Sequence, residues 1–522
     1  MREIVYNKWN KMGRFGNQLW QLSSLYGMAD RYNREPILPA PWLYQEYFEH
    51  HPKIKPLKNP PVEVGEPNFS FTGWDYWDEK EEQAGDIFGI GGWLQSSKYF
   101  SKEITNKLLK LKDEFKDKMW AKWEHVFRKP VIMIGFRVGE DYVDNGNYEI
   151  LPILYQISAL YKYFPDWREN YNILVCSDDM QYARLNMDCA ENIYFAEGID
   201  VEQMYLGTLC THFILPNSTF SYFQAYLGEK ENSRVVYPSK YFKSYLASNH
   251  STDTFWEKDW ISHDYRGEKI ALKDVCFTIP VKYDHPDRQS NLILIYRWFN
   301  ENFDTNICLG EQGKAKLVFI AGWTSYMEFP EGRFHRTKML NDMALSREEP
   351  IIVNFDCDNI CPILQLILGV DTIRKGEADM VYPYDGRAAR VKRNDWYDKL
   401  FNTNGDCGVF GGKIFPGTRE IDPISVGHIV IWNKEKFFEG GGENEHFISY
   451  GPEDIERYER FNKLGYRTKR IKGIVYHIDH WCGPDSSGSN PQFGLNYKNL
   501  ERIKKMTKEQ LLEEIKTWEW MK

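Results

Sequence analysis

The chain alternates short apolar runs with amphipathic stretches, the pattern expected of strands followed by helices. The clearest apolar run covers residues 351–355, and Asp356 and Asp358 follow it directly. Similar runs cover residues 131–136 and 213–216, each followed by polar residues. This repeated strand–helix pattern predicts an α/β protein with buried, largely parallel strands.

The polar residues that follow these runs are candidates for binding a ligand. In an open α/β sheet, ligands bind beyond the carboxyl ends of the strands, where Asp356 and Asp358 are expected. Two carboxylates at this spacing suit Mn²⁺ or Mg²⁺ together with a substrate diphosphate. His477 and His480 end another apolar run and are able to complete such a coordination shell. The alternative is a solvated strand end with ordinary polar residues nearby.

The first half offers phosphate-binding candidates without a metal. Residues 13–18 form a glycine-bearing turn before a helical stretch, where backbone N–H groups can approach a phosphate. Arg137 ends an apolar run and can neutralise a diphosphate, although pairing with Asp141 is the alternative. A polar cluster at the start of another helix can donate hydrogen bonds to a phosphate. Capping of the helix is the alternative, although it needs only one of these side chains. The cluster comprises Asn217, Ser218, Thr219 and Ser221.

A helix is predicted from about residue 452 to residue 464. Pro452 suits its first turn, and Glu453 and Asp454 gain from the helix dipole, so capping alone explains them. A carboxylate fixed at this position can also act as a general base toward a sugar hydroxyl. The segment is therefore a candidate for catalysis.

The length of 522 residues predicts two domains. A polar stretch over residues 245–270 suggests the boundary, giving domains of residues 1–262 and 263–522. The Lys-rich segment 98–122 is interspersed with Asp and Glu and predicts one solvated helix face.

Charge and cysteine content narrow the class of protein. A net charge of −9 without a basic tract argues against a nucleic-acid partner. Nine cysteines without a regular framework predict reduced thiols. The sequence has no apolar run approaching about 18 residues and no signal-peptide pattern, which predicts a cytoplasmic protein.

Most of residues 1–245 resembles the alpha-1,2-fucosyltransferases. That family implies a GT-B-like fold of Rossmann-type units, GDP-fucose as donor, no required metal, and inverting transfer to the 2-hydroxyl of a galactoside. Arg137 would then hold the donor diphosphate. The nucleotide site would be lined by Gly16, Asn17, Gln18, Asn217, Ser218, Thr219 and Ser221. The resemblance rests on residues 16–18, 95–100, 177–179 and 217–226, and on Arg137, Gly139, Asp141 and Tyr142.

The arginine motif of this half departs from the family pattern. The family usually has His-x-Arg-Arg-Gly-Asp-Tyr, whereas residues 135–142 have Gly-Phe-Arg-Val-Gly-Glu-Asp-Tyr. The histidine and the second arginine are therefore missing, and one residue is inserted. This departure leaves open that the first half is a non-catalytic glycan-binding module.

Residues 275–510 resemble the inverting galactosyl- and N-acetylgalactosaminyltransferases of GT-A fold, above all the beta-1,4-galactosyltransferase type. The match rests on residues 334–341, 356–358, 440–442 and 450–454, and on His477, His480, Asn490 and Pro491. Tyr450 stands where the family usually has Trp, and Pro452 where it has Gly.

This second resemblance implies roles for individual residues. The metal ligands would be Asp358 and His480, with Asp356 and His477 close behind. Asp454 would be the base, with Glu453 beside it. The nucleotide-sugar site would comprise Pro280, Arg288, Phe334, Arg336, Asp356 and Tyr450.

Together, the two resemblances predict a bifunctional glycosyltransferase. The second half would transfer galactose or N-acetylgalactosamine from the UDP-sugar in β linkage with Mn²⁺ or Mg²⁺, and the first half would fucosylate that sugar from GDP-fucose. The expected acceptor is a glycan or glycolipid, with peripheral membrane contact through a lipid-linked acceptor. The alternatives are a single UDP-sugar-dependent activity beside a glycan-binding module, and a nucleotide-sugar hydrolase.

Overall fold

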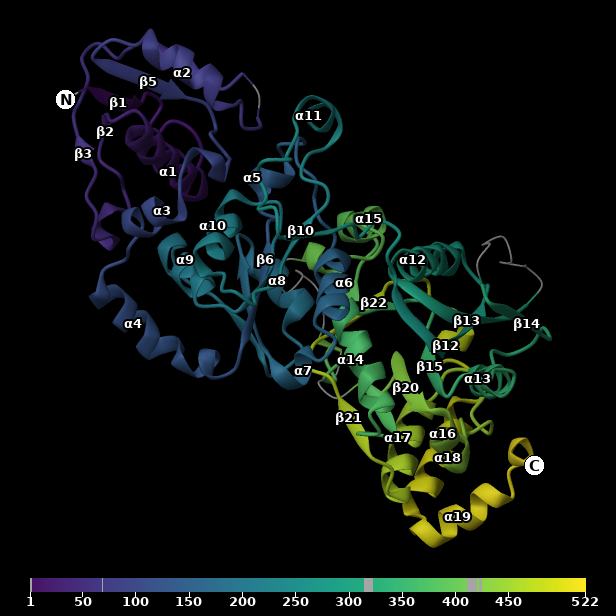
Figure 1. Cartoon of the computed structure of the whole chain (residues 1–522). Helices are drawn as coiled ribbons and strands as arrows, with labels where there is room; N and C mark the ends of the chain where they lie inside the picture. Colours follow the sequence, from purple (N-terminus) through teal and green to yellow (C-terminus); the bar gives the residue numbers. More distant parts are fainter. Residues whose placement is uncertain (1, 68, 314–322, 411–419, 422–424) are drawn as a thin grey trace. The chain divides into compact units, whose positions relative to one another are not determined.

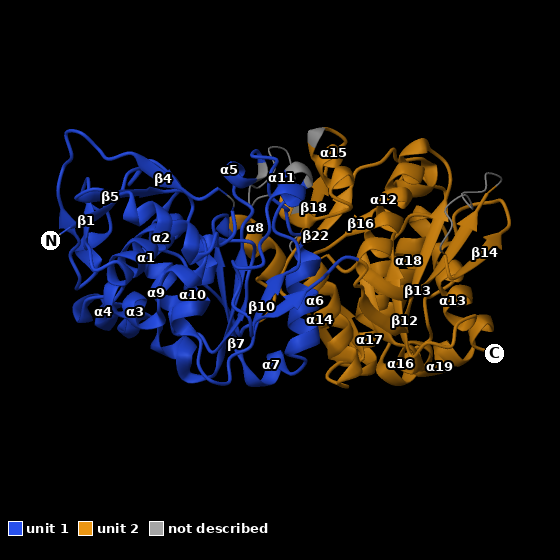
Figure 2. Cartoon of the chain, turned by 45° about the horizontal axis from the view of Figure 1, so that its top comes forward, with its two compact units in different colours: residues 1–180, 191–266 blue, residues 181–190, 267–522 orange. Residues whose placement is uncertain are grey.

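The computed structural model describes residues 2–67, 69–313, 323–410, 420–421 and 425–522. These residues form two compact units, coloured separately in Figure 2. Unit 1 contains residues 1–180 and 191–266, and unit 2 contains residues 181–190 and 267–522. Among the described residues, no helix has the length and apolarity needed to cross a bilayer.

Unit 1 contains two parallel sheets, as the apolar runs predicted. The first has the order β3-β2-β1-β5-β4. The second has the order β11-β10-β9-β6-β7-β8. The strands of the first sheet are β1 (Glu3–Tyr6), β2 (Glu35–Leu38), β3 (Lys53–Ile54), β4 (Glu63–Gly65) and β5 (Ile87–Gly91). Those of the second are β6 (Val131–Phe136), β7 (Asn172–Ser177), β8 (Ile193–Phe195), β9 (His212–Ile214), β10 (Val235–Pro238) and β11 (Ile261–His263).

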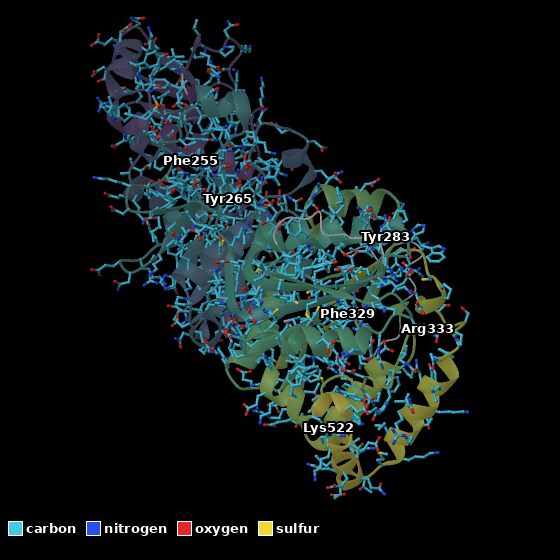
Figure 3. The ribbon with its side chains drawn as sticks, turned by 90° about the vertical axis from the view of Figure 1, so that its right-hand side faces the viewer. Phe255, Tyr265, Tyr283, Phe329, Arg333 and Lys522 are labelled. Atoms are coloured by element: carbon cyan, nitrogen blue, oxygen red, sulfur yellow. The ribbon has the colours of Figure 1, made fainter. Side chains whose placement is uncertain are left out.

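Several helices of unit 1 pack around an aromatic-rich core. Helix α1 (Phe15–Arg31) packs against α10 (Thr219–Gly228), and Trp20 of α1 contacts Tyr222 of α10 and the buried Phe255, which Figure 3 labels. The other helices are α2 (Trp74–Glu82), α3 (Lys102–Leu108), α4 (Asp113–Trp123), α5 (Glu140–Val143), α6 (Ile153–Tyr163), α7 (Trp167–Asn170), α9 (Asp200–Thr208) and α11 (Ser244–Asn249).

The prediction of one solvated helix over residues 98–122 is wrong. Helix α3 ends at Leu108 and α4 begins at Asp113. Leu109 and Leu111 between them are buried, and Leu111 forms a β-bridge with Phe48. The charge pattern favours a continuous helix, but burial of these leucines favours a break. The chain leaves the helix at this point so that both leucines reach the core.

Unit 2 is built on a seven-stranded mixed sheet with the order β14-β13-β12-β15-β20-β17-β21. Strands β12, β13 and β15 lie side by side in Figure 1. Strand β15 is parallel to β12, as predicted, but antiparallel to β20. The strands are β12 (Ile270–Lys282), β13 (Phe303–Gln312), β14 (Ser325–Phe329), β15 (Ile351–Phe355), β17 (Met380–Tyr382), β20 (Ile429–Asn433) and β21 (Thr468–Arg470).

A smaller four-stranded sheet of unit 2 positions the residues around Asp358. Its order is β16-β22-β18-β19. Strand β16 begins directly after Asp358 and is antiparallel to β22, with Asn359 opposite His477. The strands are β16 (Asn359–Ile360), β18 (Ala388–Val391), β19 (Glu420–Ile421) and β22 (Val475–Ile478). This register places the segment that contains Asp358 beside the segment that contains His477, although the two are more than a hundred residues apart in the sequence.

The helices of unit 2 surround these sheets. Helix α17 begins at Glu453, close to the predicted start, and its buried face includes Phe461. The helices are α8 (Met180–Met187, of which residues 181–187 belong to this unit), α12 (Pro286–Asn302), α13 (Arg336–Leu345), α14 (Ile363–Arg374), α15 (Asp395–Asn402), α16 (Lys434–Glu439), α17 (Glu453–Leu464), α18 (Phe493–Lys505) and α19 (Lys508–Lys516).

Candidate functional site

Unit 2 contains a cavity of about 540 Å³ at the carboxyl end of β15. Every residue predicted for the C-terminal site lines it. They are Pro280, Arg288, Phe334, Arg336, Asp356, Asp358, Tyr450, Glu453, Asp454, His477 and His480. The structure therefore brings together side chains that the sequence separates by up to two hundred residues.

Three of these residues form a group able to hold a metal ion. Ligand atoms of Asp358, His477 and His480 all lie within 4.8 Å of one another. The Nε2 atom of His480 is 3.0 Å from Oδ2 of Asp358, and Nε2 of His477 is 3.8 Å from Oδ1. The buried Nδ1 atom of His477 has no hydrogen-bond partner. One carboxylate and two imidazoles make a mixed oxygen and nitrogen set that suits Mn²⁺.

The protonation of two members of this group, Asp358 and His477, favours metal binding, whereas Asp358 raises the pKa of His480 despite burial. Burial opposes ionisation of Asp358, but His477 and His480 outweigh it and hold the pKa of the carboxyl below its ordinary value. Burial also lowers the pKa of His477. An ionised carboxylate and a neutral imidazole are the forms that coordinate metals. Arg288 competes for the same carboxylate, since its Nη1 atom lies 3.2 Å from Oδ2 of Asp358.

Asp356, a further predicted ligand, lies outside this group of three. Its Oδ1 atom accepts a hydrogen bond of 2.8 Å from Nε of Arg336, the first residue of α13. The guanidinium is therefore a positive partner of this carboxylate. Burial nevertheless raises the pKa of Asp356, against the opposing effect of Arg336.

Asp454 lies at the start of α17 and is held in place by two arginines. Its Oδ1 atom lies 3.2 Å from Nη1 of Arg336 and 2.8 Å from Nη2 of Arg457. Arg457 is fully buried and also pairs with Glu443 at 2.9 Å. Both arginine contacts fall on Oδ1, which leaves Oδ2 as the oxygen suited to take a proton.

The two adjacent carboxyls of α17 differ in protonation. Burial opposes ionisation of Asp454, but Arg336 and Arg457 outweigh it and keep its pKa below the ordinary value. Burial and the neighbouring Asp454 raise the pKa of Glu453 to about 8. The buried Oε2 atom of Glu453 has no hydrogen-bond partner. Near neutral pH, Asp454 is thus the ionised member and Glu453 the protonated one.

An aromatic group lies at the same cavity and was only partly predicted. Tyr450 and Tyr497 line the cavity and are about half exposed. Tyr450 stacks on Phe493 of α18, with ring centroids 6.0 Å apart and ring planes 2° from parallel. Such exposed aromatic faces are suited to stack on sugar rings. No local sequence pattern indicates Phe493 and Tyr497, because their proximity to Tyr450 depends on how α18 packs.

Unit 1 contains a cavity of about 270 Å³ and a second of about 180 Å³ that shares several lining residues with it. The predicted residues that line the larger cavity are Gly16, Asn17, Arg137, Ser218, Thr219 and Ser221. Asn217 lines the smaller one, where its amide also donates to the carbonyls of Glu149 and Tyr241.

Gln18, also predicted at the nucleotide site, lines neither of these two cavities. It is buried, and its Oε1 atom accepts a hydrogen bond of 3.1 Å from Nε1 of Trp42. Gly16 has a packing role besides any phosphate contact. A Cβ atom there would lie 2.6 Å from the backbone nitrogen of Phe220, so glycine permits α1 to approach α10.

Arg137 is held in place by two carboxylates. It pairs with Asp141 at 2.8 Å and with Asp178, whose carboxylate also accepts from the backbone N–H groups of Val138 and Gly139. The predicted alternative of pairing with Asp141 is therefore present in the structure. Arg14, which the sequence analysis did not single out, lines both cavities and lies 3.2 Å from Asp141.

Comparison with known families identifies the chain. The profile described as Glycosyl transferase family 11 matches residues 2–264, just over half of the 522 residues. The chain belongs to glycosyl transferase family 11. A second profile, described as N-terminal domain of galactosyltransferase, matches residues 423–481. That segment carries Tyr450, Glu453, Asp454, His477 and His480 of this family 11 chain. Both resemblances noted in the sequence are confirmed by these matches.

Individual relatives of this family 11 protein are distant. The O-antigen biosynthesis glycosyltransferase WbnK of Escherichia coli is 29% identical over 123 residues, which cover 22% of this chain and 40% of that protein. The chain thus spans less than half the length of this curated relative.

Solved structures resemble each half of the family 11 chain at low scores. NodZ alpha-1,6-fucosyltransferase soaked with GDP-fucose is 17% identical, covering 43% of this chain and 92% of that one, with a TM-score of 0.30. The catalytic domain of Drosophila beta1,4galactosyltransferase 7 complexed with xylobiose is 14% identical, covering 38% and 65%, with a TM-score of 0.23. These scores are too low to support an argument about either unit.

Proposed function

We propose that this chain is a bifunctional glycosyltransferase with two catalytic domains, residues 1–262 and 263–522. The second transfers galactose or N-acetylgalactosamine from a UDP-sugar in β linkage. The first transfers fucose from GDP-fucose to the 2-hydroxyl of that sugar. The observation that carries the proposal is that each unit has its own cavity with charged side chains in its lining, one built around Asp358, His477 and His480 and the other around Arg137.

The UDP-sugar site of a GT-A domain is proposed for the cavity of unit 2. Asp358, His477 and His480 fit Mn²⁺ by donor type and by the mutual proximity of their ligand atoms. When bound, the ion would offset negative charge on the UDP leaving group. Arg288 and Arg336 line the same cavity and add positive charge toward a diphosphate.

Asp454 is the proposed general base. The acceptor hydroxyl oxygen attacks the anomeric carbon, the bond from that carbon to the UDP oxygen breaks, and Asp454 takes the hydroxyl proton. A single displacement of this kind inverts the anomeric centre. Arg336 and Arg457 keep the carboxylate ionised and oriented before the reaction. Tyr450 and Tyr497 are placed to stack on the acceptor sugar.

The fucosyl site of a GT-B-like domain is proposed for the cavities of unit 1. Arg137 would contact the diphosphate of GDP-fucose, and the hydroxyls of Thr219 and Ser221 would donate to it. Across the described residues, the group of three possible metal-ligating side chains lies in unit 2. Charge neutralisation in unit 1 is therefore assigned to arginine.

The two reactions would be consecutive. The product of the UDP-sugar reaction carries the 2-hydroxyl that the fucosyl reaction consumes. Linking both sites in one chain raises the local concentration of this intermediate at the second site. A lipid-linked glycan at a cytoplasmic membrane surface is the proposed class of acceptor.

A donor screen by mass spectrometry tests the proposal. The whole protein is incubated with UDP- and GDP-sugars and simple glycoside acceptors in the presence of Mn²⁺. We expect one hexose or N-acetylhexosamine to be added from the UDP-sugar, followed by one deoxyhexose from GDP-fucose. Absence of GDP release with a terminal β-galactoside would identify unit 1 as a binding module. Free sugar released regardless of acceptor would identify a hydrolase.

A further inference from the structure

Arg14 lies in the turn that connects β1 to α1 in unit 1, directly after Gly13. It lines both cavities of that unit, as Arg137 does. The two arginines come from turns more than a hundred residues apart in the sequence, and both contact Oδ2 of Asp141, at 3.2 Å from Arg14 and 2.8 Å from Arg137. The fold thus brings two guanidinium groups to one carboxylate at the cavities.

The sequence context gives this pair significance. The resembling family has two consecutive arginines in its motif, but this chain has Val138 after Arg137. An uncharged side chain at residue 138 leaves one guanidinium from this segment to meet a diphosphate. Arg14 supplies a second one from another part of the chain.

The two arginines differ in how firmly they are held. Arg137 is 16% exposed and pairs with both Asp141 and Asp178. Arg14 is 63% exposed, and its ion pair with Asp141, itself 54% exposed, is a surface contact. Surface ion pairs contribute little to stability, so Arg14 can exchange Asp141 for an entering anion at small cost. Asp141 would keep Arg137 as its partner.

The other acidic residues of the larger cavity are already engaged. Asp178 accepts from two backbone N–H groups as well as from Arg137. Asp200 accepts from the hydroxyl of Tyr44 at 3.1 Å. Neither carboxylate therefore holds Arg14, which is the more exposed of the two arginines in the lining and can reorient toward a ligand.

We propose that Arg14 is the second diphosphate-binding arginine of unit 1 and replaces the cation missing at residue 138. The inference rests on the proposed function, since it assumes that a nucleoside diphosphate sugar enters these cavities. Guanidinium groups bind phosphate through paired charge-assisted hydrogen bonds, which glutamine at residue 14 cannot make.

Calorimetric titration of the whole protein with GDP tests this role. We expect Arg14→Gln to weaken GDP binding about tenfold to a hundredfold, the range for a charge-assisted hydrogen bond. Guanosine, titrated by ligand-observed NMR, lacks the phosphates and should bind both proteins within about twofold. Arg14→Lys, which keeps the charge, should recover part of the GDP affinity. Lys11→Gln removes the same charge from an exposed residue of the same turn that lines neither cavity, and should bind GDP normally.

The outcomes separate this inference from the proposed function. Arg14→Gln binding GDP within about twofold of the unsubstituted protein would overturn the inference. Equal losses for GDP and guanosine would also overturn it, because they indicate a structural role. An unsubstituted protein that binds neither GDP nor GDP-fucose would contradict the proposed fucosyl function itself. Guanosine binding and the thermal melting of the same variants report whether unit 1 is folded.

Discussion

The cavities of the two units differ in the possible metal ligands among their lining residues. In unit 2, the cavity groups Asp358 with two imidazoles, and Asp454 with Glu453. In unit 1, two arginines and several hydroxyls line the cavities. Carboxylate and imidazole ligands allow a divalent cation to offset the charge of a diphosphate, whereas the unit 1 cavities offer arginines for this purpose. If the proposed function holds, one chain stabilises two nucleoside diphosphate leaving groups in separable ways.

The largest effect is expected from Asp454→Asn. Loss of the base should lower kcat of UDP-sugar transfer about a thousandfold, within the range for general base catalysis, while UDP-sugar affinity stays within a few-fold. Steady-state kinetics and calorimetry measure both quantities. Glu459→Gln on the same helix is a matched control, because Glu459 does not line the cavity. Near-normal turnover of the Asn variant would remove Asp454 as the base.

Asp358→Ala should separate the two units by their metal requirement. Removing the carboxylate leaves two imidazoles, so the Mn²⁺ concentration for half-maximal UDP-sugar transfer should rise more than about a hundredfold. GDP-fucose transfer, measured on a preformed β-galactoside, should not change. Unaltered Mn²⁺ dependence in this variant would show that the metal is held elsewhere.

Arg137→Ala is the reciprocal experiment in unit 1. Loss of this largely buried guanidinium should lower GDP-fucose transfer by about a hundredfold, because a charge-assisted contact to the diphosphate disappears. UDP-sugar transfer by unit 2 should not change, and guanosine binding serves as the control for folding of unit 1. If the Ala variant fucosylates at the rate of the unsubstituted protein, diphosphate binding does not depend on Arg137.

Glu453→Gln should produce the smallest effect, on stability. Because the pKa of Glu453 is raised from 4.5 to about 8, the folded state holds this proton more tightly than the unfolded state between these pH values. Its contribution to stability is present below about pH 4.5 and is lost as the pH rises toward 8. Glutamine does not ionise, so the variant does not lose stability between these pH values. Its Tm at pH 8 should therefore be higher by about 2 °C, while Tm at pH 5 changes less. Scanning calorimetry at both pH values measures this, and a lower Tm at pH 8 would contradict the assignment.

Much of unit 2 was predictable because its signals are local. The apolar run of β15 and the two carboxylates after it indicate a strand end at a ligand site, and the structure has the cavity there. The meeting of Asp358 with His477 needed the antiparallel register of β16 and β22. The sequence supplied the residue types for this meeting, whereas the register comes from the folded sheet.

The contacts that the sequence did not predict have a common physical origin in long-range packing. Asp356, a predicted metal ligand, is paired with Arg336 at the start of α13. Gln18, predicted at the nucleotide, contacts Trp42 in the core. Arg14 was not predicted, because its relevance depends on a partner, Asp141, in α5 of unit 1. Side-chain direction and partner choice of this kind are not visible in local periodicity.

Titration of the whole protein with UDP and with GDP, each with and without Mn²⁺, measures whether the two nucleotides are bound by different means. We expect that UDP binds tightly only when Mn²⁺ is present, that GDP binds equally with and without it, and that Arg137→Ala weakens GDP binding alone. A common metal requirement for both nucleotides, or Mn²⁺-independent binding of UDP, would contradict this expectation.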